Sequence, residues 1–579
     1  MSEARLREML RRGPILMDGA TGHELFRLGM PSGACPEAWV LQNPELVRDL
    51  QSRYVAAGSR IILTPSFGAN RPKLAQYGLD SDVAGLNRRL AELSRSVAGD
   101  ALVAGDVSMT GDLVRPTGSL DFEDAVDIFR EQIRGLVQGG VDLLFIETMV
   151  DLAEARAALI AAREACELPV ICSMTFESDG ATVTGAHPAS ALVTLQSLGA
   201  FAVGCNCSTG PADMLGIISE MAPYAEVPLV AKPNAGLPRI TPDGEAEYPL
   251  SPGEFAREYA PLLGAGVEIV GGCCGTNPEH IAALAALDDS LLGRPPREDG
   301  SHRGIICSPR KRVDFREERL RIIGERINPS RNETLSSALR RGEMQVVREY
   351  AIEQEDCGAD LLDVNVGSPS SEELEIIDAV IEEMSAREVP IAVDSADPAV
   401  IRRALRRYPG RALVNSISLE TDKVEVLMDI CREYGAAFIA LPIGDEGIPK
   451  TVDDRLALLR DIREKAGREY DIDEDDIVCD CLMLPLSADP SAGTNALRLV
   501  ERVRVELGAP AVLGLSNLSF GLPNRSSLNA TFLAMATERG LNFAIANPCD
   551  GAVADARAAG EALLGRDEGL VEYIGAERF

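Results

Sequence analysis

Two adjacent cysteines, Cys273 and Cys274, follow an apolar run in the segment "VEIVGGCCGTNPEH", and Cys205 and Cys207 end another in "AFAVGCNC". Three thiolates can occupy three corners of a tetrahedral zinc site and leave the fourth for a substrate, whereas a structural zinc site normally has four protein ligands. An open zinc activates a further thiol, because coordination deprotonates it at neutral pH. We therefore take Cys207, Cys273 and Cys274 as candidate zinc ligands, and Cys205, which lies farther from the strand end, as a packing residue.

Polar residues end many of the other apolar runs. In the first half these residues are Asp18, Asp106, Glu147 and Asn234, and in the second half Glu325, Asn328, Asp363, Asn365, Asp394, Asn415, Asp480, Asn517 and Asn547. Carboxylates accept hydrogen bonds and Asn both donates and accepts, so the second set suits a heterocycle with amide and amine edges, such as a pterin. The alternative is that these side chains only cap helices and shape turns, where Asp and Asn are common.

The spacing of the apolar runs indicates which elements position these residues. Strand-like runs alternate with amphipathic helical stretches, which favours parallel strands joined by helices. Before residue 290 the runs are "ILMDGA", "IILTPSF", "LVAGDV", "LLFIET", "PVICSMTF", "AFAVGCNC", "PLVAKPNA" and "VEIVGGCC". Eight units predict a closed (β/α)8 TIM barrel, in which active sites lie at the carboxyl ends of the strands. A Cys-Cys pair alone is more often a buried pair beside a glycine turn, but the shared rim favours the metal site.

The alternation of strand-like runs and helical stretches stops at "LLGRPPREDGSHRGIICSPRKRVDF". This segment is rich in Pro, Gly and charged residues and is typical of an interdomain linker. Eight further runs follow: "RIIGERIN", "LLDVNVG", "PIAVDSAD", "ALVNSIS", "AFIALPIG", "IVCDCLML", "AVLGLSNLSF" and "FAIANPCD". We expect an α/β chain of two TIM barrels, at residues 1–292 and 317–579, joined by a linker at 293–316.

The composition narrows the classes of protein and partner. A formal charge of −33 disfavours nucleic acid and anionic membranes as partners, because both select clustered Lys and Arg. No apolar stretch approaches the roughly 20 residues that span a bilayer, and the amino terminus lacks the apolar core of a signal peptide, so we expect a cytoplasmic protein. Thirteen cysteines in 579 residues do not indicate a disulfide scaffold.

Several motifs resemble those of the cobalamin-dependent methionine synthases. "MDGATG", "GCNCSTGP" and "GGCCGTNPEHI" resemble the family's zinc-dependent, homocysteine-binding barrel. "GERINPS", "GADLLDVNVG", "VNSIS" and "GLSNLSFGLPNRSSLN" resemble its folate-binding barrel. The resemblance covers nearly the whole chain, in the family's order.

The resemblance implies roles for individual residues. Cys207, Cys273 and Cys274 match the zinc ligands and count, with Asn517, as the catalytic residues. Asp18, Gly19, Ala20 and Thr21 match the loop that holds the amino-acid end of homocysteine, Glu147 matches the acceptor of its ammonium, and Asn234 matches a residue beside the open zinc position. In the second barrel Asn365, Asp394, Asn415 and Asp480 match pterin-binding positions, and Asn517 matches the residue facing N5 of the pterin. The family usually continues with Pro and Gly after its aspartate of strand six, whereas this chain reads "CDCLMLP", which leaves the loop after Asp480 in question.

The activity that the resemblance implies is methyl transfer from 5-methyltetrahydrofolate, through a corrinoid, to zinc-activated homocysteine. The family's corrinoid module carries an Asp-x-His-x-x-Gly signature, and none of the four histidines of this chain stands in that context. We therefore expect cobalamin to be supplied in trans, by a separate corrinoid protein or free in solution. Two alternatives stay open: a corrinoid-dependent methyltransferase with another thiol acceptor, and a non-catalytic zinc-binding partner of a corrinoid protein.

Overall fold

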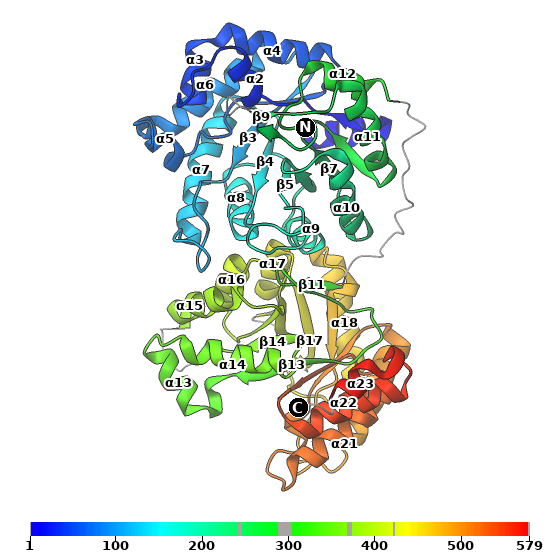
Figure 1. Cartoon of the computed structure of the whole chain (residues 1–579). Helices are drawn as coiled ribbons and strands as arrows, with labels where there is room; N and C mark the ends of the chain where they lie inside the picture. Colours follow the sequence, from blue (N-terminus) through cyan, green and yellow to red (C-terminus); the bar gives the residue numbers. More distant parts are fainter. Residues whose placement is uncertain (1, 241–245, 288–303, 368–372, 421–422, 577–579) are drawn as a thin grey trace. The chain divides into compact units, whose positions relative to one another are not determined.

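A computed structural model describes residues 2–240, 246–287, 304–367, 373–420 and 423–576. The chain divides into two compact units, Met1–His302 and Arg303–Phe579 (Figure 1). In each unit strands alternate with helices, and parallel strands form a barrel, so the predicted α/β class with two TIM barrels is confirmed. No helix within the described residues is long and apolar enough to cross a bilayer.

The first barrel contains the eight strands that the sequence predicts. They are β1 (Ile15–Leu16), β2 (Ile61–Leu63), β3 (Leu102–Ser108), β4 (Leu143–Met149), β5 (Val170–Met174), β6 (Ala202–Asn206), β7 (Leu229–Lys232) and β10 (Val267–Val270). Neighbouring strands pair in parallel, and β1 pairs with β10. A bridge between Met17 and Ile61 joins the outer edges of β1 and β2, so the hydrogen bonding continues around the ring. A short hairpin, β8 (Arg239–Ile240) with β9 (Ala246–Glu247), was not predicted.

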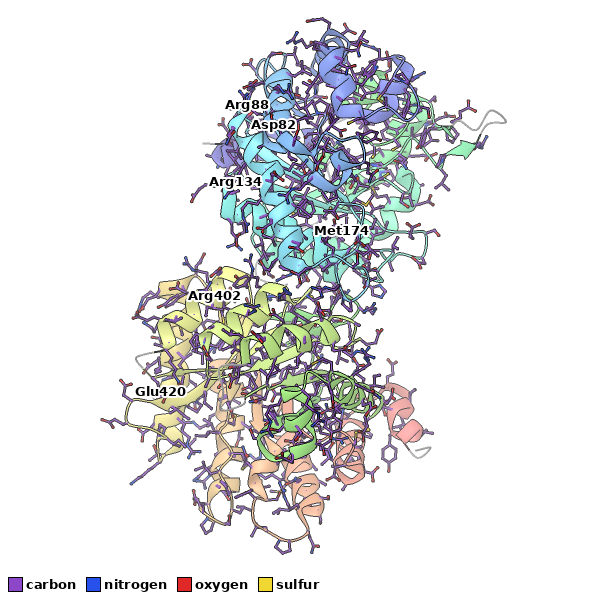
Figure 2. The ribbon with its side chains drawn as sticks, turned by 90° about the vertical axis from the view of Figure 1, so that its left-hand side faces the viewer. Asp82, Arg88, Arg134, Met174, Arg402 and Glu420 are labelled. Atoms are coloured by element: carbon purple, nitrogen blue, oxygen red, sulfur yellow. A yellow bond between two sulfur atoms is a disulfide. The ribbon has the colours of Figure 1, made fainter. Side chains whose placement is uncertain are left out.

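Helices surround this barrel. They are α1 (Ser2–Arg12), α2 (Gly22–Arg27), α3 (Pro36–Gln42), α4 (Pro44–Ala56), α5 (Arg71–Ala75), α6 (Val83–Arg95), α7 (Phe122–Gln138), α8 (Leu152–Ala165), α9 (Pro188–Ser197), α10 (Pro211–Met221), α11 (Pro252–Gly264) and α12 (Pro278–Ala285). Local chemistry sets their starts: Asp82, labelled in Figure 2, accepts a hydrogen bond from the Gly85 N–H and caps α6. Asp121 and Asp151 cap α7 and α8 in the same way.

Alternation along the strands fills the interior of the first barrel. Leu102 and Ala104 of β3, and Leu143 and Phe145 of β4, belong to one buried cluster, which Leu6 and Leu10 of α1 also join. Because successive side chains of a strand point to opposite faces, the next inward positions on β3 and β4 are residues 106 and 147. The apolar core therefore ends just below the strand ends where polar side chains begin.

The second barrel repeats this plan and is closed. Its strands are β13 (Arg321–Ile327), β14 (Leu361–Val364), β15 (Ile391–Asp394), β16 (Leu413–Leu419), β17 (Ala437–Gly444), β18 (Ile477–Asp480), β19 (Ala511–Gly514) and β20 (Phe543–Ala546). Its helices are α13 (Glu333–Arg340), α14 (Gln345–Asp356), α15 (Glu373–Ser385), α16 (Pro398–Arg407), α17 (Val424–Tyr434), α18 (Val452–Tyr470), α19 (Ala492–Arg502), α20 (Leu515–Leu518), α21 (Arg525–Glu538), α22 (Gly551–Leu563) and α23 (Val571–Ala576).

Part of the segment predicted as linker belongs to the second unit. Residues 305–314 form an antiparallel hairpin, β11 (Ile305–Cys307) with β12 (Arg312–Asp314). Ile306, Val313 and Phe315 join the buried interior of the second barrel, and Phe315 contacts Phe543 edge to face at a ring distance of 5.5 Å. The sequence did not predict that these three apolar side chains are buried, because charged residues and glycines surround them. Residues 293–303 of the predicted linker lie outside the described residues.

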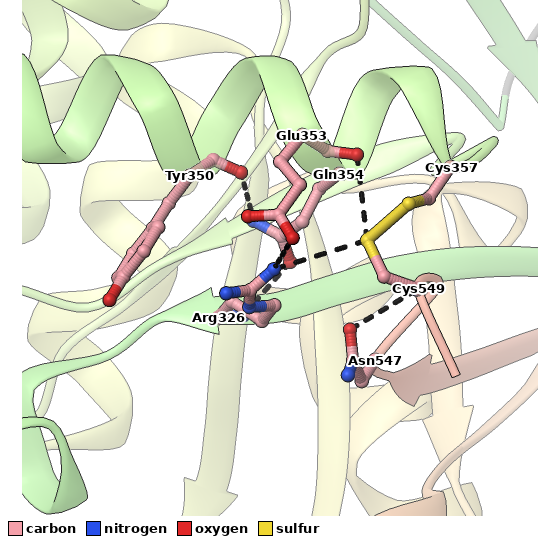
Figure 3. Close-up of a disulfide and its surroundings, with 7 residues drawn as sticks. All are labelled: Arg326, Tyr350, Glu353, Gln354, Cys357, Asn547 and Cys549. Atoms are coloured by element: carbon pink, nitrogen blue, oxygen red, sulfur yellow. Dashed lines mark hydrogen bonds and ion pairs between the residues drawn. A yellow bond between two sulfur atoms is a disulfide. The ribbon is translucent and has the colours of Figure 1, made fainter.

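One disulfide joins two distant segments of the second unit. Cys357 directly follows α14, and Cys549 lies in the turn after β20, 192 residues away (Figure 3). Arg326 of β13 lies beside this bridge and forms an ion pair of 2.6 Å with Glu353 of α14. The bridge therefore links the helix after the first strand of this barrel to the turn after its last strand. The sequence analysis did not predict this pairing, and the other eleven cysteines are free.

The hairpin predicts a stability effect that the linker assignment does not. Phe315→Ala should lower the free energy of unfolding of the second unit by about 3–5 kcal/mol, because it leaves a cavity beside Phe543. Denaturant unfolding followed by circular dichroism measures the loss. The single tryptophan, Trp39, reports the first unit, whose transition should not move. Phe520→Ala, at a side chain that is 45% exposed, is the matched control and should change the free energy by about 0.5 kcal/mol or less.

Candidate active sites

The three predicted thiols lie together at the carboxyl end of the first barrel. The sulfur atoms of Cys207, Cys273 and Cys274 are all within 4.8 Å of one another, and those of Cys207 and Cys274 are 3.9 Å apart. Within the described residues no other His, Cys, Asp or Glu joins this group. Three clustered thiolates are soft donors of the kind that bind zinc or copper(I), and they leave a coordination position for another ligand.

Backbone conformation separates Cys207 from Cys205. Residues two apart share a face in a regular strand, so an uninterrupted β6 would point both thiols toward the helices. The strand ends at Asn206, and Cys207 and Ser208 take left-handed φ angles of 64° and 57°, which turn the Cys207 side chain into the rim. Cys205 is buried, as expected for a packing residue.

The turn that carries Cys273 and Cys274 is held from two sides. The Asn234 side-chain oxygen accepts the Cys274 N–H at 3.0 Å, so Asn234 orients this turn through its carboxamide. Gly275 has φ 80°, and a Cβ there would lie 2.2 Å from the Tyr248 ring, so only glycine fits. Hydrogen bonds from the Cys207 and Cys273 thiols lower the pKa of Cys274, and Tyr248 contributes in the same direction.

The loop of Asp18 to Thr21 lies beside the thiols and is already hydrogen-bonded. Asp18 accepts the Leu63 N–H at 2.7 Å and pairs with the Lys232 ammonium at 3.3 Å. The Ala20 N–H donates to the Thr276 hydroxyl at 3.1 Å. A Cβ on Gly19 would lie 2.7 Å from the same hydroxyl. The loop is thus held close to the residues that follow the Cys-Cys pair.

Three carboxyl groups and one ammonium lie buried below the thiols. Burial raises the pKa of Asp18, and it raises that of Glu147 to about 7. Burial and the charge of Glu147 raise the pKa of Asp106 well above its usual range. Burial lowers the pKa of Lys232, but the charges of Asp18 and Glu147 outweigh it and raise the pKa above its ordinary value. Lys232 therefore stays charged and partly offsets the carboxyl groups.

Asn206 connects the carboxyl groups to the thiols. Its side-chain nitrogen donates to Glu147 at 2.9 Å and lies 3.9 Å from the Cys273 sulfur. Its side-chain oxygen accepts the Ser173 hydroxyl at 2.7 Å and the Thr148 N–H at 2.9 Å. Thr148 has a left-handed φ of 58°, a strain that this contact helps to hold. A single amide thus lies between the carboxyl end and the thiol end of the site.

A cavity of about 460 Å³ is lined by some of these groups, but not by Asp18, Asn206, Cys207 or Asn234. Its lining includes Gly19, Ala20, Thr21, Asp106, Glu147, Lys232, Cys273 and Cys274. Apolar side chains such as Leu25, Leu63 and Phe67 form other parts of the wall. Polar groups converging in a partly apolar cavity are typical of a site for a small charged molecule.

The second barrel has a larger cavity, of about 770 Å³, at its carboxyl end. Its lining includes Asp394, Asn415, Asp480 and Asn517, together with Glu325, Asp363, Arg326, Ser516, Arg525 and Asn547. Asn365 does not line this cavity. Its amide donates to the Asp394 carboxyl at 2.9 Å and so positions that side chain.

Burial raises the pKa values of carboxyl groups that line this second cavity. Burial raises the pKa of Asp363 well above its usual range, and the charge of Asp394 raises it further. Burial raises the pKa of Asp480 to about 6, although the Leu482 N–H donates to it at 2.7 Å. Asn415 donates to Asp363 at 3.0 Å, and Ser516 donates to Glu325 at 2.6 Å. The wall therefore offers both acceptors and protonated donors near neutral pH.

Several residues of the two sites were not predicted from the sequence. In the first site these are Asn206, Lys232, Tyr248 and Thr276. In the second site Arg326, Ser516 and Arg525 were not named, and Glu325, Asp363 and Asn547 were named only as strand ends. Period-two counting would have found two of those in the first site. Val230 is inward and Lys232 is the next inward position of β7, and on β6 Asn206 shares the inward face of Ala202. Tyr248 and Thr276 lie in loops, where no periodic signal exists.

Comparison with known proteins finds a family model that matches each unit. Residues 15–287 match the family model described as homocysteine S-methyltransferase, and residues 324–547 match that described as pterin binding enzyme. The chain is 30% identical over 582 residues to the methionine synthase of Mycobacterium leprae and 29% identical over 573 residues to that of Mycobacterium tuberculosis. Each alignment covers 93% of this chain and 48% of the relative, so the chain spans about half the length of these curated relatives.

A solved structure resembles the first unit. The metallated form of the homocysteine methyltransferase MmuM from Escherichia coli is 26% identical, with a TM-score of 0.41, over 48% of this chain and 99% of that one. The two family matches and the two methionine synthases agree on the class of enzyme. Along this chain, a segment that matches the homocysteine S-methyltransferase model is therefore followed by one that matches the pterin binding enzyme model.

The buried charges of the first site predict a coupled stability effect. Lys232→Met should lower the free energy of unfolding of the first unit by about 3–5 kcal/mol, because it leaves the Asp18 carboxylate buried without its cation. Adding Asp18→Asn should restore part of the loss, since a neutral amide still accepts the Leu63 N–H. Trp39 fluorescence during denaturant unfolding measures both variants, and equal losses in the single and double variants would contradict the pairing.

Proposed function

We propose, for a chain that joins a homocysteine S-methyltransferase domain to a pterin-binding domain, that it transfers the methyl group of 5-methyltetrahydrofolate to homocysteine. The observation that carries this proposal is the first cavity, which is lined by two thiols of the three-cysteine cluster and by the buried carboxyl groups of Asp106 and Glu147, with Asn206 contacting both Glu147 and Cys273. An amino acid with a thiol on a short side chain matches both ends of that arrangement.

The donor set of the first barrel fits zinc. Cys207, Cys273 and Cys274 would hold the ion, and their clustered sulfur atoms account for three of its four ligands. When bound, zinc lowers the pKa of a fourth thiol and presents that thiol as a nucleophile at neutral pH. The chain contributes orientation: Asn234 holds the Cys274 amide, and Asn206 lies against Cys273.

The amino-acid end of homocysteine would lie over Glu147 and the loop of residues 18–21. Glu147 would accept its ammonium, because a buried carboxylate without a cation favours a charged donor. The carboxylate would lie against the backbone of Gly19 to Thr21. Since the Ala20 N–H already donates to Thr276, the carboxylate either displaces that hydroxyl or uses the neighbouring N–H groups.

The second cavity would hold 5-methyltetrahydrofolate. Asp394, Asn415 and Asp480 would bind the amide and amine edge of the pterin, with Asn365 positioning Asp394. Asn517 would face N5 and hold a proton near that nitrogen as the methyl group leaves. A corrinoid would carry the methyl group between the two sites. The residues of each barrel contribute position and charge.

Zinc content tests the metal assignment. The purified protein should contain one zinc per chain by elemental analysis, because three thiolates converge on one point. Cys273→Ala should lose most of that zinc, since it removes one of three ligands. Cys205→Ala is the matched control, two residues from Cys207 but outside the cluster, and should keep the metal. A wild-type protein that purifies without zinc and gains no activity from added zinc would overturn the site.

Mutation should separate the two half-reactions, because each cavity draws its side chains from its own barrel. Cys207→Ala should abolish methylation of homocysteine by free methylcobalamin and leave transfer from methyltetrahydrofolate to cob(I)alamin nearly intact. Asn517→Ala should slow the second transfer by about 10²–10³, the usual cost of one transition-state hydrogen bond, and spare the first.

The same assays test the alternatives. Without cobalamin, the wild type should make no methionine from methyltetrahydrofolate. Corrinoid-free transfer, or one substitution that silences both half-reactions in a folded protein, would refute the two-site proposal. Faster methylation of another thiol than of homocysteine would favour the other acceptor, and no turnover with any thiol would favour a non-catalytic partner.

A further inference from the structure

The side chain of Asp106 lines the first cavity, and its backbone N–H and carbonyl form hydrogen bonds with neighbouring residues of the barrel. The Asp106 N–H donates to Thr64 at 2.9 Å, and its carbonyl accepts from Ser66 at 2.8 Å. The carboxyl group is only 4% exposed and lines the cavity. Among the described residues, its Oδ1 atom has no hydrogen-bond partner. A buried acceptor without a partner costs free energy unless a ligand supplies the missing donor.

The nearby cation, Lys232, already forms an ion pair with another carboxyl group. Lys232 pairs with Asp18 at 3.3 Å, and its ammonium lies 5.2 Å from the centre of the Phe145 ring. No Lys, Arg or His of the described segments forms an ion pair with Asp106 or Glu147. Asp106 and Glu147 thus line the cavity without an ion pair of their own, although the charge of Lys232 acts on both carboxyl groups.

Asp106 and Glu147 both line the first cavity, and each is buried. Two buried carboxyl groups in one cavity cannot both ionise cheaply, and this repulsion, added to burial, raises the pKa of Asp106. A bound cation removes that cost, because each carboxylate then has an opposite charge. A primary ammonium suits the pair especially well, since its three N–H donors can reach two acceptors and one further group.

We propose that Asp106 is a second acceptor for the ammonium of homocysteine, which it holds together with Glu147. This inference rests on the proposed function. It extends that function by naming a residue that selects α-amino thiols over thiols without an amine. Asn206 sets the spacing, because its amide contacts Glu147 on one side and Cys273 on the other. A ligand whose thiol lies at the cysteines therefore brings its amine to the carboxyl pair.

The test compares two ligands that differ only in the amine. Homocysteine and 4-mercaptobutanoate share the thiol and the carboxylate, and only homocysteine carries the ammonium. Asp106→Asn should weaken homocysteine binding, measured by titration calorimetry on the zinc-loaded protein, by about 10- to 100-fold. The affinity for 4-mercaptobutanoate should change less than about threefold. In the methylcobalamin assay, KM for homocysteine should rise while kcat stays within about threefold.

A matched control separates this role from general damage. Asp151→Asn replaces another buried carboxyl, 6% exposed, whose pKa burial also raises, but which caps α8 and does not line the cavity. It should alter neither affinity, since Asn also caps helices. Zinc content and Trp39 fluorescence confirm that each variant is folded and loaded. If Asp106→Asn does not fold, Asp106→Glu, which moves the carboxylate by one methylene, replaces it with the same two ligands.

Each outcome decides the inference. A selective loss for homocysteine supports it. Equal losses for both ligands would show a structural role for Asp106, and unchanged binding of both would show that Asp106 does not meet the amine. The proposed function fails separately: a wild-type protein that does not methylate homocysteine at all overturns that function, whatever Asp106 does.

Discussion

Side-chain alternation along a closed ring of parallel strands is the constraint on which both sites depend. In each barrel every second residue points inward, and the interior is filled by apolar side chains up to the strand ends. The next inward position on a strand therefore lies directly above the core. On β3, β4, β6 and β7 these positions are Asp106, Glu147, Asn206 and Lys232. The apolar core below these four side chains fixes their position along the barrel axis, and the pairing of the strands fixes the distances between them.

Polar groups at that level carry an electrostatic cost that shapes the chemistry of the site. Burial disfavours the charged forms of Asp18, Asp106 and Glu147, and one lysine compensates only part of their charge. A site of this kind is poorly satisfied without its ligands, because unpaired buried charge is expensive in a low dielectric. Binding a metal at the thiols and an ammonium at the carboxyl groups would remove much of that cost. The cavity is thus better suited to a cation-bearing ligand than to a neutral one.

The sequence predicted the fold more completely than the side-chain geometry. All sixteen strand-like runs appear as barrel strands, because hydrophobic period and connection length are local properties. The thiol cluster was also predictable, since strand order brings the ends of β6 and β10 to one rim. The hairpin of β11 and β12 was not, because Ile306 and Phe315 stand among Pro, Gly and charged residues, and their burial depends on a barrel formed later in the chain. The placement of Asn365 behind Asp394 was hidden for a similar reason: only the pairing of β14 with β15 decides which of the two faces the cavity.

The two cavities differ in size and in the chemistry of their walls. The first is small and partly apolar, and it concentrates charge at two points joined by Asn206, which suits a short molecule with a charged group at each end. The second is larger, and hydrogen-bonding side chains cover much of its wall, which suits a flat heterocycle with several donor and acceptor edges. Each set of side chains comes from the strands and loops of one unit, so the two sites can be built and tuned independently. Under the proposed function, a methyl group that starts in one cavity and ends in the other would need either movement of the units or a carrier. The chemistry of methyl transfer favours a carrier, because direct displacement would require both ligands to meet in line within a single cavity.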